Sequence, residues 1–236
     1  MDHADLEIIH ALENTHVRRP PRQRLSSFGD TTVRYYLVSE PAYVLESHAE
    51  SETVVREGTV TAQRPAIVTP AYMLHLEGFG AEAKRSLEYL GRLYGPGCPG
   101  LMYTYKNEVL DPSIVKGKVE AVAGRIAKDL DRNGKDLAAV IVGVDNLWDV
   151  SLLKFIYELT ASAFQSNVAE LQQHGLLRPD PVAGIPQGAL QTIETLFRSV
   201  EFGGTNPAEL KMELDRWDLF PRYEDRFLSL FRGKRR

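Results

Sequence analysis

The sequence has a single cysteine, Cys98, among 236 residues, so no disulfide can form within the chain. Long apolar runs are also lacking. The longest, Leu137–Val144 (LAAVIVGV), has eight residues, whereas a membrane-spanning helix needs about 18 or more. The first residues, MDHADLEIIHALEN, are acidic and lack the basic and apolar regions of a secretory signal. These absences predict a cytoplasmic protein that does not associate with a membrane.

Familiar chemical motifs are missing as well. The sequence contains neither the phosphate loop GxxxxGK[ST] nor a GxGxxG that follows a strand, two glycine-rich motifs that bind nucleotides. No set of catalytic side chains is recognisable from its spacing, and the segments match no family signature. We therefore predict no catalytic residue, no cofactor and no metal ion, and whether the chain is an enzyme is left open.

The N-terminal segment, from about Ala4 to Thr15, predicts a short helix. His3, Glu7 and His10 fall on one side of this helix, and Glu-x-x-His pairs of this kind bind metals in some helical bundles. A metal site needs converging ligands from several elements, and no further Glu-x-x-His occurs outside this segment. We therefore interpret these residues as a solvated helix face.

Basic residues cluster in two segments near the ends of the chain. There are 28 Lys and Arg against 32 Asp and Glu, which gives a net charge of −4. Val17–Arg24 (VRRPPRQR) carries four Arg, and Arg232–Arg236 (RGKRR) carries four basic groups, so the rest of the chain is acidic. A nucleic-acid-binding protein would present a basic domain instead. This pattern argues against nucleic acid as the partner and favours solvated ends or contacts with an acidic subunit.

Strand patterns dominate the first part of the chain. The β-branched and aromatic residues of Thr31–Val38 (TTVRYYLV) predict a strand, and Pro41 opens one or two helical turns after it. Gly58 divides Glu52–Ala62 into two strand-like halves, which is typical of a hairpin or a bulged strand.

A strand, a helix and a second strand follow. Leu101–Glu108 alternates as a strand does, a helix opens at Pro112 and extends past Leu130, and Leu137–Val144 is apolar on both faces. A strand of the last kind belongs inside a sheet that is covered on both sides. Residues 101–144 therefore predict a βαβ element.

The remaining patterns predict a helical C-terminal third. The expected helices are a long one from about Asp149 to His174, two more at about 186–200 and 207–219, and a last one after Pro221. The fold class is α+β or α/β, with a small mixed β-sheet. We expect the chain to be organised in three consecutive ranges. Residues 1–24 form an N-terminal helix and a basic Pro/Arg linker, and residues 25–180 form an α/β core domain. Residues 181–236 form a helical extension that packs on the core or on a second subunit.

Polar residues directly after the buried strand are the best-placed candidates for binding a ligand. Asp145 and Asn146 follow this strand, and Asp149 opens the next helix. Ligands of open α/β sheets collect at this position, although the same residue types also make turns and cap helices. Cys98, in a Gly/Pro-rich loop, is the fourth candidate, although a reactive thiol needs a base or a helix N-terminus nearby.

The apolar arc of helix 149–174 is wide, which is typical of a helix at the centre of a domain or at a subunit interface. The C-terminal helices add many more apolar residues, among them Leu214 and Phe227. We predict a protein that acts by self-assembly, as a homodimer, or by binding a protein partner. The alternative is a small-molecule-binding domain or an enzyme whose polar site follows strand 137–144.

Overall fold

The computed structural model describes residues 3–42, 51–76 and 81–232. Helices make up 48% of the structure and strands 23%, and the main sheet is mixed. These proportions confirm the α+β class with helices in the C-terminal part. The helical turns expected after Pro41 and the basic residues 233–236 lie outside the described residues.

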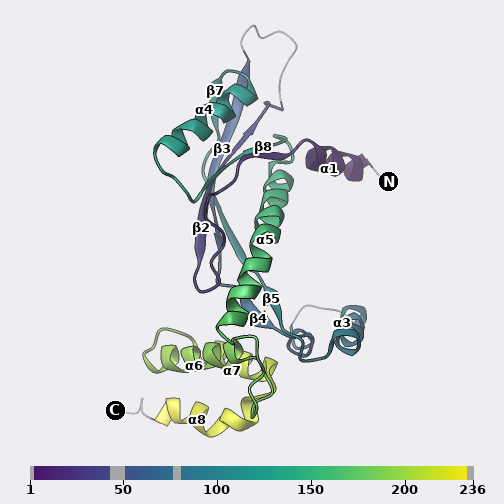
Figure 1. Cartoon of the computed structure of the whole chain (residues 1–236), viewed down its shortest axis with the longest axis vertical. Helices are drawn as coiled ribbons and strands as arrows, with labels where there is room; N and C mark the ends of the chain where they lie inside the picture. Colours follow the sequence, from purple (N-terminus) through teal and green to yellow (C-terminus); the bar gives the residue numbers. More distant parts are fainter. Residues whose placement is uncertain (1–2, 43–50, 77–80, 233–236) are drawn as a thin grey trace. The chain divides into compact units, whose positions relative to one another are not determined.

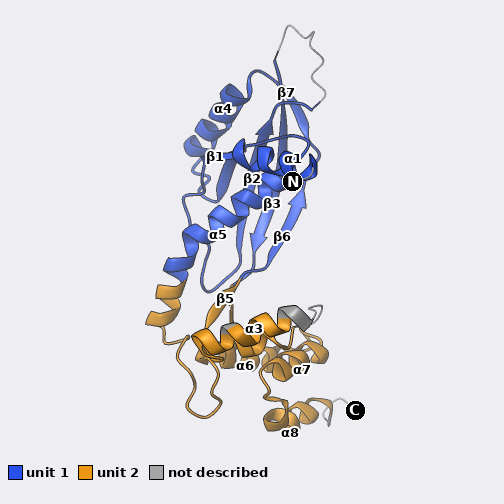
Figure 2. Ribbon diagram, turned by 90° about the vertical axis from the view of Figure 1, so that its right-hand side faces the viewer, with its two compact units in different colours: residues 1–64, 103–167 blue, residues 65–102, 168–236 orange. Residues whose placement is uncertain are grey.

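The chain divides into two compact units, each built from two separate stretches (Figure 2). Unit 1 comprises residues 1–64 and 103–167, and unit 2 comprises residues 65–102 and 168–236. The sequence patterns predict three consecutive ranges instead, because such patterns do not show which distant segments pack together. Those ranges remain a prediction about domains.

Unit 1 is a mixed sheet with helices. It contains α1 (His3–Glu13), β1 (His16–Arg19), β2 (Thr31–Ser39), β3 (Glu52–Ala62), β6 (Tyr105–Val109), β7 (Ser113–Lys116), α4 (Val119–Arg132), β8 (Ala138–Val142) and most of α5 (Trp148–Gln173). The strand order is β1-β8-β2-β3-β6, and β7 also pairs with β3. Among these pairs, β2 and β8 run parallel and the others run antiparallel.

Strand β8 lies inside the sheet, as its apolar sequence predicts, and all five of its residues are buried. Val140 and its neighbours at alternate positions pack with α4, whereas Ala139 and Ile141 pack with α5. Figure 1 shows the two helices on opposite faces of this sheet. A strand of five apolar residues is stable here because both of its faces are covered.

The segment before β8 differs in detail from the expected βαβ element. The strand expected at 101–108 is divided into β5 (Gly100–Met102), which belongs to unit 2, and β6 in the main sheet. The helix begins at Val119 rather than at Pro112, because residues 113–116 pair with β3 as β7 and Gly117 then turns the chain with φ 127°. β7 and β8 run in the same direction and α4 connects them, with β2 and β3 lying between the two strands.

The basic segment after α1 is not a solvated linker throughout. Residues of β1 pair with β8, and Arg19 is only 6% exposed. Its Nε donates to Asp131 Oδ1 at 2.8 Å, and its terminal nitrogens donate to the carbonyl oxygens of Lys135 and Ala138. The acceptors come from the end of α4 and the turn that follows it, so the burial of Arg19 depends on tertiary structure.

Strand β3 is continuous, so the expectation of a hairpin or a bulge at Gly58 is wrong. Its register with β2 has no shift between Thr31 and Ser39, and Gly58 stands opposite Tyr35. A Cβ at position 58 would lie 2.5 Å from the carbonyl oxygen of Glu108 and would also overlap the ring of Tyr35. The glycine therefore makes room for a buried aromatic side chain and does not turn the chain.

Unit 2 is mostly helical. It contains β4 (Ala66–Val68), which pairs with β5, followed by α2 (Pro70–Met73), α3 (Ala81–Tyr94), the end of α5, α6 (Gln187–Glu201), α7 (Pro207–Arg216) and α8 (Phe220–Arg232). Its largest apolar cluster joins α6, α7 and α8 to Val68 and Tyr72. Leu214 is fully buried in this cluster and Phe227 is 8% exposed. These C-terminal apolar residues therefore form the core of unit 2.

Candidate functional site

Asp145, the first residue predicted to bind a ligand, already has partners within unit 1. Its side chain is 10% exposed and forms an ion pair with Arg56, with 2.9 Å between Oδ1 and Nη2. Its second oxygen accepts a hydrogen bond from the backbone N–H of Ala42 at 3.1 Å. A half-buried carboxylate with a cation and an amide donor is well satisfied without a ligand.

The partner arginine comes from β3, which β2 separates from β8, and it stands opposite Leu37 of β2. Its guanidinium carbon lies 5.6 Å from the ring centroid of Trp148 at the start of α5, within the range of a cation–π interaction. Arg56 Nε and Ser39 Oγ are buried atoms that have no hydrogen-bond partner among the described residues. These two atoms are therefore still available for hydrogen bonds, although Arg56 neutralises the charge of Asp145.

Asn146 is exposed and lines a cavity of about 540 Å3 between the loop after β8 and α1. The same cavity is lined by three polar side chains of α1: His3, Glu7 and His10. His3 Nδ1 lies 3.5 Å from Glu7 Oε1. Among the described residues, no group of three or more His, Cys, Asp or Glu side chains is arranged to hold a metal ion.

Asp149 and Cys98 lie apart from these residues. Asp149 is exposed in the first turn of α5, where its Oδ1 accepts from the N–H of Val150 at 2.9 Å. A negative charge at this position stabilises the helix through its dipole. Cys98 is an exposed free thiol in unit 2, whereas the other three candidates belong to unit 1. The four residues therefore do not form one site within either unit.

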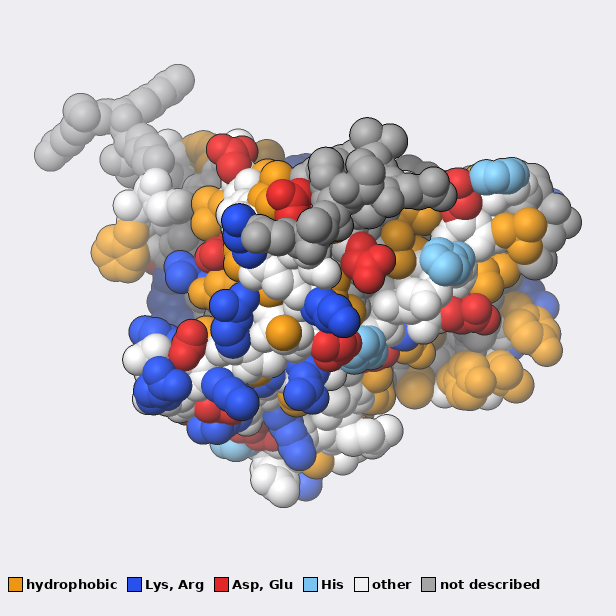
Figure 3. All heavy atoms as spheres, turned by 90° about the horizontal axis from the view of Figure 1, so that it is seen from above, with side chains coloured by type: hydrophobic (Ala, Val, Ile, Leu, Met, Phe, Trp, Pro, Cys, Tyr) orange, Lys and Arg blue, Asp and Glu red, His pale blue; other side chains and the backbone are white. Residues whose placement is uncertain are grey.

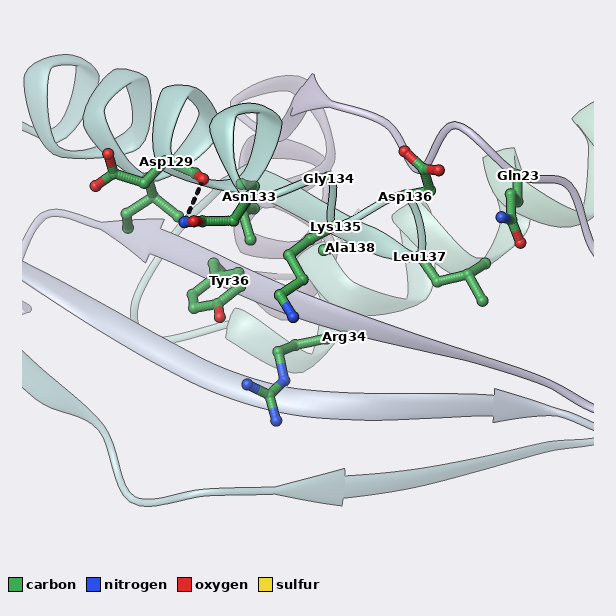
Figure 4. Close-up of a pocket in the computed structure, with 12 residues that line it drawn as sticks. Gln23, Arg34, Tyr36, Asp129, Asn133, Gly134, Lys135, Asp136, Leu137 and Ala138 are labelled. Carbon is green, nitrogen blue, oxygen red and sulfur yellow. Dashed lines mark hydrogen bonds between the residues drawn. The ribbon is translucent and has the colours of Figure 1, made fainter.

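A larger cavity of about 730 Å3 lies elsewhere in unit 1, on the sheet face that α4 covers (Figure 4). Its lining comes from β2, the end of α4, the turn that follows, the start of β8 and one residue after β1: Gln23, Arg34, Tyr36, Ile126, Asp129, Leu130, Asn133, Gly134, Lys135, Asp136, Leu137 and Ala138. Volumes of this order are typical of small-molecule sites.

The sequence by itself does not predict this cavity. Arg34 and Tyr36 alternate with buried residues in TTVRYYLV, so the sequence does indicate that they share one face of a strand. Lys135 follows the Asn-Gly turn that ends α4. Nothing in the sequence shows that this turn lies beside β2, because that contact depends on the parallel pairing of β2 with β8.

Comparisons with protein-family models, with curated proteins and with solved structures found no match. Within the described ranges, none of the helices has the length and apolar character needed to cross a membrane. Only the geometry of the chain itself therefore indicates its function.

Proposed function

We propose that this protein functions by self-assembly, as a two-fold dimer formed through the outer face of α5. We define the outer stripe of α5 as Leu153, Tyr157, Ala161 and Phe164. At 100° per residue these positions fall within about 80° of one another. A cytoplasmic location is part of the same proposal and is supported by the single cysteine.

The exposure of this stripe is the observation that carries the proposal. Leu153 is 64% exposed, Tyr157 is 74% exposed and Phe164 is 38% exposed. They lie on the side of α5 opposite its buried residues Leu152 and Phe155, which pack on the sheet. The helix is therefore apolar on both its inner and its outer side, and a contiguous exposed apolar surface of this kind is typical of an interaction site.

The other helix on the sheet, α4, provides an internal comparison. Its inner residues Val122 and Ala123 are buried, but its outer face is exposed and rich in Lys and Arg: Lys118, Arg125, Lys128 and Arg132. Figure 3 shows Lys and Arg side chains gathered on one part of the molecular surface. Of these two helices, α4 therefore has a solvated outer face and α5 has an apolar one.

A second copy of the chain is the occupant that the stripe fits best. If two α5 helices pair antiparallel about a two-fold axis, Leu153 lies opposite the partner's Phe164. Tyr157 then lies beside the partner's Ala161, so that a large side chain meets a small one. An interface with two-fold symmetry must be self-complementary in this way, and two-fold dimers are the commonest soluble oligomers. The stripe is about 16 Å long, shorter than the helices of large permanent interfaces, so we expect a dimer that dissociates on dilution.

Light scattering after size-exclusion chromatography tests the dimer. At tens of micromolar we expect about twice the chain mass of 26.5 kDa. Tyr157→Glu should give a folded monomer, because the side chain is exposed and its loss leaves no cavity. The control is Gln165→Glu, which adds the same charge at an exposed position off the stripe and should remain dimeric.

A wild-type mass near that of one chain at every concentration would contradict the proposal, and so would a dimer that Tyr157→Glu leaves intact. The alternative function, a ligand-binding or catalytic site after β8, has less support because Asp145 is already neutralised by Arg56. It remains a prediction.

A further inference from the structure

Two cations share the cavity shown in Figure 4. The side chain of Lys135 extends across the cavity toward Arg34, and the ring of Tyr36 lies beside them. Within the described part of the chain, neither cation has a carboxylate oxygen within 4.0 Å. Two like charges that lie close together repel each other, and an anion bound between them would relieve this repulsion.

Two carboxylates, Asp129 and Asp136, also line the cavity, and each has a basic partner other than these two cations. Asp136 lies 3.7 Å from Arg22, and Asp129 lies 3.4 Å from Arg132. In Figure 4 the carboxylate of Asp129 points away from the two cations. Both acids therefore have a basic partner that does not line the cavity, whereas the two lining cations have no carboxylate partner among the residues that the structure describes.

The backbone around the two cations is well ordered by hydrogen bonds. Gly134 adopts φ 62°, and the N–H of Lys135 donates to the carbonyl oxygen of Leu130 at 2.9 Å, which closes the end of α4. The N–H of Arg34 donates to the carbonyl oxygen of Leu137 at 3.0 Å. The backbone that carries these side chains therefore loses little conformational entropy when a ligand binds, whereas the two long side chains themselves must still be immobilised.

The lining also includes apolar surface. Ile126 and Leu130 contribute from α4, and Leu137 contributes from the start of β8. Small-molecule sites typically combine an apolar surface of this kind with a few polar groups that orient the ligand. The occupant should therefore carry an apolar body as well as negative charge.

We propose that this cavity binds a small phosphate monoester with an apolar or aromatic body. The guanidinium of Arg34 suits two phosphate oxygens, the ammonium of Lys135 supplies a second positive charge, and the hydroxyl of Tyr36 can donate to a third oxygen. A phosphate monoester has three terminal oxygens and close to two negative charges at neutral pH. A carboxylate has two oxygens and one charge, so it matches this donor set less well.

Calorimetric titration of the full chain with phenyl phosphate tests this proposal. We expect saturable binding at one site, and a loss of about tenfold or more in affinity for Arg34→Gln and for Lys135→Gln. Tyr36→Phe should lose less, because a neutral hydroxyl makes a weaker hydrogen bond than a cation does. The control is Lys128→Gln, which removes an exposed cation of α4 that does not line the cavity and should change affinity less than twofold.

Each variant needs a circular dichroism spectrum and a melting curve to show that it folds. Lys135 is also placed to interact with the end of α4. If Lys135→Gln lowered only the melting temperature and left binding intact, the proposal would be overturned. It would also be overturned by the absence of saturable binding, or by an equal loss for Lys128→Gln, which indicates general charge attraction. Inorganic phosphate binding as tightly as phenyl phosphate would overturn the role of the apolar lining.

Discussion

At the scale of single residues, Gly58 shows how one missing side chain organises the sheet of unit 1. Tyr35 is fully buried, and its hydroxyl donates to Asn107 Oδ1 at 3.2 Å. The ring occupies the space that a Cβ at position 58 would need. Because β3 pairs with β6 as well as with β2, the backbone at Gly58 cannot move away from the ring without breaking a ladder.

We therefore expect Gly58→Ala to lower the free energy of unfolding by about 2 kcal/mol or more, which is typical of overpacking in a sheet core. The matched control is Gly124→Ala in α4, where a new Cβ meets nothing within 4 Å and alanine favours the helix. This control should be neutral or stabilising. Urea unfolding followed by circular dichroism measures both, and equal effects of the two substitutions would contradict the explanation.

Arg19 and Asp131 form the second residue-scale feature. The hydrogen bond from Arg19 lowers the pKa of Asp131 below its usual value of 3.8. A carboxyl whose pKa is lower in the folded state stabilises the fold above the unfolded pKa, and this contribution is lost as the pH falls through the folded pKa. The stability contributed by this pair should therefore be present at neutral pH and disappear in acid.

The substitution Asp131→Asn tests this expectation. The variant should be less stable than the wild type at pH 6, because Arg19 stays buried without its anionic partner. The difference between the two urea midpoints should shrink as the pH is lowered from about 4 toward 2. A difference that stays constant over this range would show that the ion pair is not responsible.

At the scale of elements, Tyr72 connects α2 to α7 in unit 2. Its hydroxyl donates to Glu213 Oε2 at 3.0 Å, and its ring centroid lies 4.6 Å from that of Trp217. Glu213 also accepts a hydrogen bond from Trp217 Nε1 at 3.0 Å. These contacts hold α2 in place, because a helix of only four residues is not stable on its own.

Burial raises the pKa of Tyr72 from 10.0 to about 12, and the negative charge of Glu213 adds to this effect. In the unfolded chain Tyr72 loses its phenolic proton near pH 10, whereas in the folded chain it does so only near pH 12. The contribution of the protonated Tyr72 to the free energy of unfolding is therefore complete below pH 10 and is lost as the pH rises from 10 to 12. Tyr72→Phe should therefore lose less stability between pH 9 and 11.5 than the wild type does. Tyr89→Phe, at a position of α3 that is 64% exposed, is the control and should follow the wild type in melting experiments.

At the scale of the whole molecule, each unit combines two stretches of chain. The core of unit 2 joins Val68 and Tyr72 from the first stretch to α6, α7 and α8 from the second. The first stretch, residues 65–102, therefore lacks most of its apolar partners when the C-terminal helices are absent. The consecutive ranges expected from the sequence predict the opposite: residues 25–180 would form an intact core without the C-terminal helices.

A chain that ends at Asp180 distinguishes the two descriptions. We expect amide hydrogen exchange to remain slow in β8, whose partners are all in unit 1, and to become fast in residues 65–76 and 81–102. The full-length chain is the reference. Protection of residues 65–76 that survives the truncation would show that the core of unit 2 does not need its C-terminal helices.

The sequence by itself determined the elements with strong local patterns. The apolar run at 137–144 specified an inner strand, and the apolar spacing with Gly175 specified a long helix that ends where α5 ends. The wide apolar arc of this helix also indicated the surface from which the dimer proposal starts. These features depend on side chains that are neighbours in the chain, so their periodicity is visible in the sequence.

Tertiary structure alone decided which distant residues meet. It paired Asp145 with Arg56, buried Arg19 against the end of α4, and brought Lys135 to the same cavity as Arg34. Each of these contacts depends on the pairing of β8 with β1 and β2, and such pairing is selected by the burial of whole faces of the sheet. No local sequence pattern predicts this strand pairing, because the free energy that favours it comes from burying surfaces formed by segments far apart in the chain.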